Sequence, residues 1–209
     1  MSYCILIPTI NRKDLLIEAL DWYIPNLKGT EIIVLDNGKQ GIASGAPNLK
    51  VFESEENKGV AGSWNWLINK AIERGHTYFL ILNDDIILKR NHSEIIDIIY
   101  RWGDNTFHRP RPFYNWSAFI LNKSIYEKVG EFDEAFEKCF FEDNDYEYRM
   151  RLAGITIRYE DALNAEVYRN SQTIEKDPLL GGYIQNRDYY IYKWGGIPES
   201  ETYKTPFNL

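Results

Sequence analysis

The sequence predicts an α/β protein in which a buried, largely parallel sheet is flanked by helices. Two observations support this fold class. Short apolar runs that are hydrophobic on both faces alternate with stretches of helical periodicity. Residues 3–35 contain a strand, a helix and a second strand, which together form a βαβ unit. Parallel strands of such a unit end at the same edge of the sheet, and ligands bind there.

In the first half of the chain, each predicted strand is a short apolar run followed by polar residues. The first strand is followed by a helix over residues 14–24, and we expect Pro25 to end this helix. Residues 57–65 precede a second helix, and their glycines would let the backbone approach an anion at the helix N-terminus. The predicted strands are residues 3–8, 31–35, 51–52 and 77–82.

The second half begins with an amphipathic helix over residues 93–102. Residues 103–112 contain two prolines and have no periodicity, so we expect a loop in which His108 and Arg109 are solvated. The remaining predicted elements are a strand over 113–121, helices over 124–129 and 146–153, a strand over 155–159 and a helical segment over 182–196.

Length, charge and cysteine content limit the classes of protein to which this chain can belong. The 209 residues fit one domain with a two- or three-layer core. A formal net charge of −7 argues against nucleic acid or an anionic membrane as the main partner, because both require a basic surface. No apolar run is long enough to span a bilayer, and no signal-peptide pattern is present. Cys4 and Cys139 lack metal-ligand spacing, so we expect buried thiols in a reducing, cytosolic compartment.

The fourth predicted strand ends abruptly in Asn83, Asp84 and Asp85. Adjacent carboxylates at the edge of a core repel each other, which is unfavourable unless a cation takes up the charge. Mg²⁺ and Mn²⁺ commonly bind one or two carboxylates together with substrate phosphates. An ordinary turn or helix cap explains the same three residues about as well. We expect Thr9 and Asp36, which follow the first two strands, to lie on the same edge.

A nicotinamide- or flavin-binding domain would carry a GxGxxG turn after its first strand. This chain has PTINRKD at residues 8–14 instead. Dinucleotide binding of that kind is therefore excluded.

Five segments, in order along the chain, resemble the inverting glycosyltransferases of family 2. The segments are ILIPTINR at 5–12, EIIVLDNG at 31–38, NKGVAGSWN at 57–65, LNDDI at 82–86 and VGEFDEAFEKCFFEDNDYEYRMRLAG at 129–154. The resemblance implies a three-layer α/β/α GT-A fold with a Rossmann-like mixed sheet. It also implies one domain over 1–209, in which 1–102 bind the nucleotide sugar and 103–209 form the acceptor side.

The implied activity is the transfer of a sugar from a UDP- or dTDP-sugar to a glycan, glycoprotein or other hydroxyl acceptor, with Mn²⁺ or Mg²⁺ as cofactor. Residues 57–65 and the tail NRDYYIYKWGG at 186–196 are similar to rhamnosyltransferases that act on bacterial or viral glycans. A virally encoded chain would act in the host cytoplasm.

The resemblance also assigns roles at the donor side. Asp85 is the expected direct metal ligand. Asp84 is expected near the ribose or the nucleotide and as a second metal ligand, and Asn83 is expected to support the turn. Asp36 would accept the imide N–H of uracil or thymine beside Thr9. The full set of expected nucleotide-sugar-binding residues is Pro8, Thr9, Asp36, Asn37, Asn57, Gly62, Trp64, Asn65, Asn83 and Asp84.

On the acceptor side, the resemblance makes Asp143 the general base, with Glu142 as the alternative. An inverting displacement needs a carboxylate on the face of the sugar opposite the leaving group. We expect Asp145 to face the helix N-terminus, where a carboxylate is favoured. Without the resemblance, a capped and solvated helix start would explain this cluster of acids.

The chain departs from the family in two places. Trp64 stands where many relatives have Arg, so the diphosphate would lose a cation and gain a stacking surface. Relatives often end the last core strand with a metal-binding His, whereas this chain has Tyr168, Arg169 and Asn170. No third protein ligand is therefore assigned, and Arg169 is expected to meet phosphate.

Two alternatives stay open. A non-catalytic nucleotide-sugar- or glycan-binding relative is favoured by the missing His and opposed by the intact carboxylates. A sugar-nucleotide pyrophosphorylase would share the fold and the metal. It usually carries a Gly-rich loop after its first strand, which this chain lacks.

Overall fold

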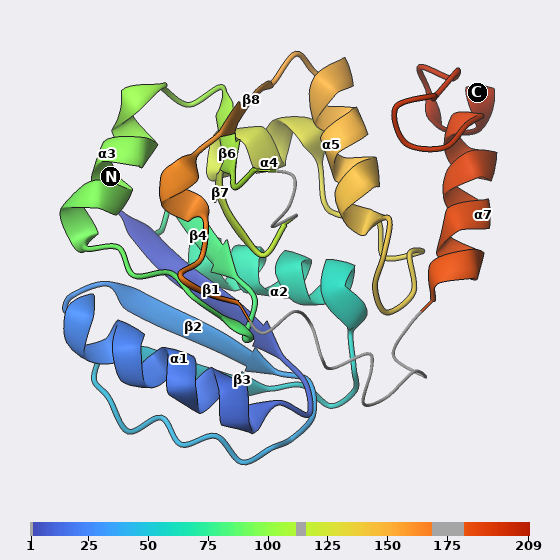
Figure 1. The fold of residues 1–209 in the computed structure, drawn as a ribbon. Coiled ribbons are helices and arrows are strands. Elements are labelled where there is room, and N and C mark those ends of the chain that lie inside the picture. Colours follow the sequence, from blue (N-terminus) through green and yellow to red (C-terminus); the bar gives the residue numbers. More distant parts are fainter. Residues whose placement is uncertain (1, 112–115, 169–181) are drawn as a thin grey trace.

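The computed structural model describes residues 2–111, 116–168 and 182–209. Seven of the strands in these residues form one mixed sheet, and helices pack on both of its faces (Figure 1). This arrangement confirms the predicted three-layer α/β/α fold.

The order of strands in the sheet is β3-β2-β1-β4-β7-β6-β8. β1 pairs in parallel with β2 and β4, whereas β7 runs antiparallel to β4 and β6. The strands are β1 Tyr3–Thr9, β2 Glu31–Asp36, β3 Leu49–Glu53, β4 Tyr78–Leu82, β6 Thr106–Arg109, β7 Ala118–Asn122 and β8 Thr156–Tyr159. A separate two-stranded pair joins β5 Ile86–Ile87 to β9 Val167–Tyr168.

The alternation of side chains along β1 creates the two cores. Ile5 and Ile7 pack with one set of helices, and Cys4 and Leu6 pack with the other. The first set is α1 Lys13–Asn26 and α3 His92–Arg101, and the second is α2 Gly59–Glu73, α4 Lys123–Val129 and α5 Glu142–Leu152. The last helix, α7 Tyr183–Trp194, lies beside α5 (Figure 1). Short 3₁₀ helices follow at Asp161–Leu163 and Pro206–Asn208.

The strand register brings the polar ends of β1, β2 and β4 to one edge. Thr9 is paired with Asp36, and the Asn37 amide donates to the Thr9 carbonyl oxygen at 2.9 Å. The Asn83 amide, just after β4, donates to the Ser117 carbonyl oxygen at 2.9 Å. The predicted convergence of the three strand ends is confirmed.

The prediction of a loop over residues 103–112 was wrong, because β6 lies within it. His108 and Arg109 are buried there instead of solvated, with 2% and 9% of their surfaces exposed. His108 Nδ1 lies 3.3 Å from Glu160 Oε1, and Arg109 Nη2 lies 3.0 Å from Glu147 Oε2. These partners from distant segments allow two polar side chains to sit inside the sheet.

Other element boundaries differ by a few residues. The strand expected over 113–121 begins at Ala118, and residues 112–115 lie outside the described part of the chain. α5 begins at Glu142 instead of residue 146. Cys4 and Cys139 are not joined in a disulfide, and Cys139 is half-buried instead of buried. Within the described ranges, we find no helix whose length and hydropathy suit a membrane crossing.

Candidate active site

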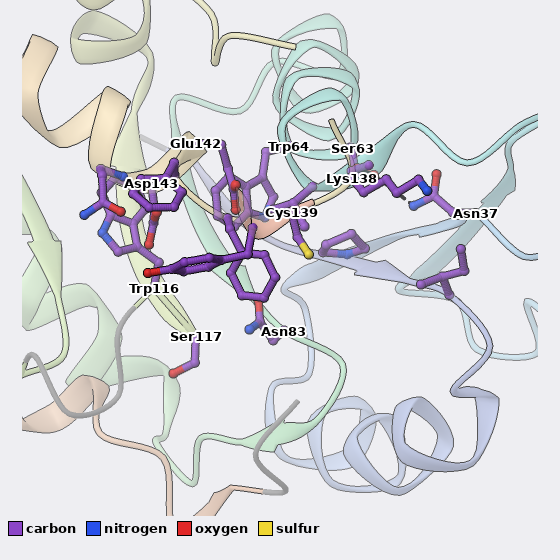
Figure 2. Close-up of a pocket in the computed structure, with 18 of the residues that line it drawn as sticks. Asn37, Ser63, Trp64, Asn83, Trp116, Ser117, Lys138, Cys139, Glu142 and Asp143 are labelled. Carbon is purple, nitrogen blue, oxygen red and sulfur yellow. Dashed lines mark hydrogen bonds between the residues drawn. The ribbon is translucent and has the colours of Figure 1, made fainter. Parts of the chain in front are cut away.

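A cavity of about 780 Å³ opens at the edge where β1, β2 and β4 end. Its volume is typical of small-molecule sites. Figure 2 shows Asn37 at one end of the lining residues and Asp143 at the other, so the cavity is elongated. The predicted site residues that line it are Pro8, Thr9, Asn37, Asn57, Trp64, Asn83, Asp84, Asp85, Glu142 and Asp143. Asp36, Gly62 and Asn65 are not among the lining residues.

Asp36 is fully buried beneath the turn that follows β2. Its carboxylate accepts hydrogen bonds from the backbone amides of Gly38 at 2.9 Å and Gln40 at 2.6 Å. The side-chain Nε2 of Gln40 also donates to Asp36 at 3.0 Å, and it lies 3.4 Å from Thr9 Oγ1. Asp36 therefore stabilises the turn. A nucleotide base would reach its carboxylate only after the Gln40 side chain moved.

Asn65 and Gly62 face the segment that precedes α5 instead of the cavity. Asn65 Nδ2 donates to the Phe132 carbonyl oxygen at 2.9 Å, and its Oδ1 accepts from the Phe132 amide at 2.8 Å. Asn65 also donates to Glu134 at 2.9 Å, and Gly62 lies against the same Glu134 carboxylate. Both residues thus join α2 to the segment that leads into the acidic cluster.

The N-terminus of α2 was expected to receive an anion. The Gly59 amide already donates to Asn57 Oδ1 at 2.9 Å, and the Val60 amide donates to the Lys138 carbonyl oxygen at 2.6 Å. Gly59 has a φ of +66°, and a Cβ there would lie 3.0 Å from the Lys138 backbone, so glycine is required. Two of the backbone amides that could bind an anion therefore already donate hydrogen bonds within the protein.

Trp64 and Asn37 both belong to the cavity wall. Trp64 is 3% exposed and its ring stacks on Trp116 with centroids 6.1 Å apart. Asn37 Nδ2 donates to Ser63 Oγ at 2.8 Å, which orients the Asn37 amide at its end of the cavity. α2 begins at Gly59 instead of after residue 65 as predicted, so Trp64 lies within the helix and brings no cation to the cavity.

The acidic pair after β4 lies beside a buried arginine. Burial, with the neighbouring Asp85 carboxylate, raises the pKa of Asp84 to about 7, while a hydrogen bond with Thr9 opposes the shift. The ion pair with Asp14 raises the pKa of Arg12, and the nearby Asp84 and Asp85 raise it further. Arg12 thus offsets part of the negative charge at this edge.

The donor set at this edge fits a hard cation that substrate oxygens would also bind. Asp84 and Asp85 supply carboxylate oxygens. Within the described ranges, no group of three or more His, Cys, Asp or Glu side chains is placed to hold a metal. Mg²⁺ keeps several waters and uses one or two carboxylates plus phosphates, so two carboxylates are enough. Arg169, expected near phosphate, and Asn170 lie outside the described residues.

Glu142 and Asp143 begin α5 at the other end of the cavity. Burial, with the adjacent Asp143, raises the pKa of Glu142 well above its usual range. Burial also raises the pKa of Asp143, whereas the Asn144 amide, which donates to Asp143 Oδ1 at 2.8 Å, lowers it. Glu142 is 5% exposed and Asp143 is half-buried, so the latter is the more accessible of the two. A half-buried carboxylate that lines the cavity suits proton transfer.

Asp145 lies in the first turn of α5, as expected, but its carboxylate also binds three side chains. It is fully buried, and its carboxylate binds Arg149 Nε at 2.8 Å, Lys193 Nζ at 2.6 Å and Trp194 Nε1 at 2.8 Å. Lys193 also lies 2.6 Å from Asp133. The third acid of the cluster therefore anchors α7 to α5.

One wall of the cavity could not be predicted from the sequence. Its backbone carries Lys138, Phe140 and Phe141 with positive φ, which no sequence pattern predicted. The spacing of Tyr183 and Arg187, four residues apart on a helix, places them on one face and was a usable signal. The unpredicted lining residues are Ile10, Gly59, Val60, Ser63, Trp116, Ser117, Lys138, Cys139, Phe140, Phe141, Asn144, Tyr183, Arg187, Ile197 and Pro198.

Comparisons with known proteins agree with this geometry. The sequence matches "Glycosyl transferase family 2" over residues 4–146. No curated protein matched the sequence. A crystal structure of GalNAc-T7 with UDP, GalNAc and Mn²⁺ is similar, with a TM-score of 0.67 and 11% identity, over 93% of this chain and 48% of that one. This chain thus spans about half the length of that chain, and the likeness shows the fold alone. Because the family match covers more than half of the sequence, the chain belongs to glycosyl transferase family 2, and it has the GT-A fold.

Proposed function

We propose that the chain transfers a sugar from a UDP- or dTDP-sugar to a hydroxyl group of a glycan or glycoprotein, with inversion at the anomeric carbon. The observation that carries this proposal is that one cavity contains two separate acidic groups, one after β4 and one at the start of α5. An inverting transfer needs this separation, since the leaving group and the base act on opposite faces of the sugar.

In the proposed reaction the acceptor oxygen forms a bond to the anomeric carbon as the bond from that carbon to the diphosphate oxygen breaks. Asp143 takes the acceptor's proton, and the nucleoside diphosphate leaves. Asp143 is favoured over Glu142 because it is more exposed to the cavity, while burial favours the protonated form of Glu142.

We place the nucleoside beside Thr9 and Asn37, with Asp36 as the acceptor for a pyrimidine imide. Gln40 Nε2 occupies a donor position 3.0 Å from the Asp36 carboxylate. An imide N–H could take that position once the Gln40 side chain moved, and the hydrogen bond would be charge-assisted. The proposed donor half is residues 1–102.

Asp85 and Asp84 would hold Mn²⁺ or Mg²⁺. When bound, the ion would supply positive charge that stabilises the departing diphosphate. Arg12 adds a fixed cation near the same carboxylates. Asn83 lies at the same edge and supports the turn through its backbone bond to Ser117.

We assign the acceptor to the opposite end of the cavity, within residues 103–209. Phe140, Phe141 and Tyr183 line the cavity, and Phe141 directly precedes Glu142 and Asp143. The ring centroids of Tyr183 and Phe141 are 5.2 Å apart, so the two form a continuous aromatic surface. Sugar rings bind well against such surfaces because their C–H faces are apolar. We also propose a cytosolic location, where Cys4 and Cys139 would stay reduced.

The test is incubation with UDP-, dTDP- and GDP-sugars, with and without Mn²⁺, followed by measurement of free nucleoside diphosphate. We expect metal-stimulated release from a UDP- or dTDP-sugar. Calorimetric binding of the donor without release, even with a broad set of glycan acceptors, would support a binding module instead. Formation of a nucleoside triphosphate after addition of inorganic diphosphate would support a pyrophosphorylase.

A further inference from the structure

α7 lies beyond the residues that match the family, yet it reaches the cavity. Tyr183 and Arg187 line the cavity, and Asn186, which lies between them on the helix, is buried with 2% of its surface exposed. Asn186 contacts the segment 137–141, which precedes α5 and forms a wall of the same cavity. This helix therefore contributes to the site both directly and through that segment.

The Asn186 side chain has four close polar contacts with the backbone of the segment. Its Nδ2 lies within donating distance of the carbonyl oxygens of Glu137 at 2.9 Å, Cys139 at 2.8 Å and Phe140 at 3.1 Å. Its Oδ1 accepts from the Glu137 amide at 3.2 Å. A buried amide that satisfies three residues of one segment fixes the path of that segment.

The segment needs such support because its backbone is strained. Lys138, Phe140 and Phe141 have φ angles of +62°, +81° and +70°. Residues with a Cβ are unfavourable in this left-handed region and remain there only where the surrounding contacts enforce it. Strain of this kind is common at functional sites.

The conformation of the segment determines where α5 begins. Phe141 is the residue before the helix, and its carbonyl oxygen accepts from the Asp145 amide at 2.9 Å. Glu142 and Asp143 follow directly. A change in the backbone at Phe140 or Phe141 would therefore rotate the first turn of α5 and move both carboxyl groups.

We propose that Asn186 is a positioning residue, which holds residues 137–141 in the left-handed conformation that presents Asp143 to the cavity. This inference rests on the proposed function in one respect, because it takes Asp143 as the base. Contacts that do not involve Asn186 hold α7 in place: Lys193 binds Asp145 at 2.6 Å, and Trp194 donates to Asp145 at 2.8 Å. Removal of the Asn186 amide should therefore loosen the segment without detaching the helix.

The test compares Asn186→Ala with Tyr190→Phe. The second variant also removes a hydrogen bond from α7, the one from the Tyr190 hydroxyl to Glu201, but that bond does not involve the segment. We expect Asn186→Ala to lower kcat roughly tenfold or more while donor affinity stays near parental, since positioning of the base acts on transfer and not on donor binding. Tyr190→Phe should keep both values. Equal losses in the two variants, or parental kcat in Asn186→Ala, would overturn the proposal.

A rescue experiment separates positioning from general stability. In the Asn186→Ala background, Lys138→Gly and Lys138→Ala both remove the lysine side chain, but only glycine accepts a φ of +62° without strain. We expect the glycine variant to have a kcat roughly fivefold above the alanine variant. Equal kcat values would show that the left-handed backbone is not what Asn186 maintains.

Hydrogen exchange, measured without substrate, distinguishes failure of this inference from failure of the proposed function. Asn186→Ala should speed exchange at the amides of residues 137–145 by roughly tenfold, and Tyr190→Phe should not. Unchanged exchange in Asn186→Ala would refute the positioning role whatever the enzyme does. Release of no nucleotide by the parent protein would refute the proposed function and leave the exchange result as the test of the segment.

Discussion

The ammonium group of Lys193 on α7 lies 2.6 Å from the carboxylate of Asp145 on α5, and both side chains are buried. Asp133 is a second partner of Lys193, also at 2.6 Å. This ion pair joins a helix outside the family match to the helix that carries the candidate base. The stability of the cavity wall therefore depends on a buried charge from the last helix.

We predict that Lys193→Met destabilises the protein. Removal of one partner of a buried ion pair leaves the other charge uncompensated, and we expect a loss of roughly 3 kcal/mol, at the low end of the usual range because Arg149 still binds Asp145. Lys123→Met is the control, since Lys123 and its partner Glu127 are exposed and that pair should contribute at most about 1 kcal/mol. Urea unfolding measures both free energies. Similar losses in the two variants would contradict the prediction.

Because Asp84 and Asp85 follow β4, binding of the nucleotide-sugar donor should depend on a divalent metal ion. We expect Asp85→Ala to remove the gain in nucleotide-sugar affinity that Mn²⁺ gives the parent protein, and to leave the fold intact. Asp21→Ala, which removes an exposed acid on α1, should leave that gain unchanged. Calorimetry with and without Mn²⁺ measures the gain. An Asp85→Ala variant that binds metal and donor as the parent does would show that the ion is held elsewhere.

The affinity for nucleoside diphosphates should depend on Asp36 and Gln40. UDP or dTDP should bind more tightly than GDP, and Asp36→Ala should cost roughly 1.5–3 kcal/mol of that affinity, the value of a charge-assisted hydrogen bond. Gln40→Ala frees the Asp36 carboxylate from one donor, so UDP affinity should stay or rise. Asp36 would have only a structural role if Gln40→Ala weakened UDP binding as much as Asp36→Ala and the three diphosphates bound equally.

Transfer should depend on pH through Asp143. Burial raises the pKa of Asp143, and a base must be ionised, so kcat should rise with pH through a value above the ordinary aspartate pKa of about 3.9. Arg109 lowers the pKa of Asp143, and Arg109→Met should therefore move this rise to higher pH. Arg151→Met is the control, because Arg151 binds the same Glu147 from the surface of the helix. Identical profiles for parent and Arg109→Met would refute the assignment.

The first half of the fold could be predicted because its strands are buried on both faces and leave continuous apolar runs. β4 is followed directly by Asn83, Asp84 and Asp85, so the acidic edge could be predicted from the same pattern. β6 could not be predicted in this way. His108 and Arg109 interrupt its pattern, and they are buried only because Glu160 and Glu147 reach them from distant segments.

The candidate site was predictable at the strand ends and not at its far wall. Lys138, Phe140 and Phe141 adopt left-handed backbone conformations without glycine, so their sequence carries no turn signal. The hydrogen bonds that support these conformations come from distant residues: from Asn186, 46 to 49 residues further along the chain, and from the Val60 amide. The position of Asp36 at the end of its strand was predicted correctly. The hydrogen bond from the Gln40 side chain, which covers its carboxylate, was not predicted.

The measurement that tests the central claim most directly is the transfer rate of Asp143→Asn beside its donor affinity, with Glu142→Gln as the matched control. Loss of a general base typically costs about 10²–10⁴-fold in rate and does not weaken donor binding. We expect Asp143→Asn to lose at least about 10²-fold with near-parental affinity for the nucleotide sugar and Mn²⁺. Glu142→Gln should lose much less, because Glu142 is buried and burial favours its protonated form, which glutamine resembles. Parental transfer by Asp143→Asn, with the loss appearing in Glu142→Gln or in neither variant, would contradict the account.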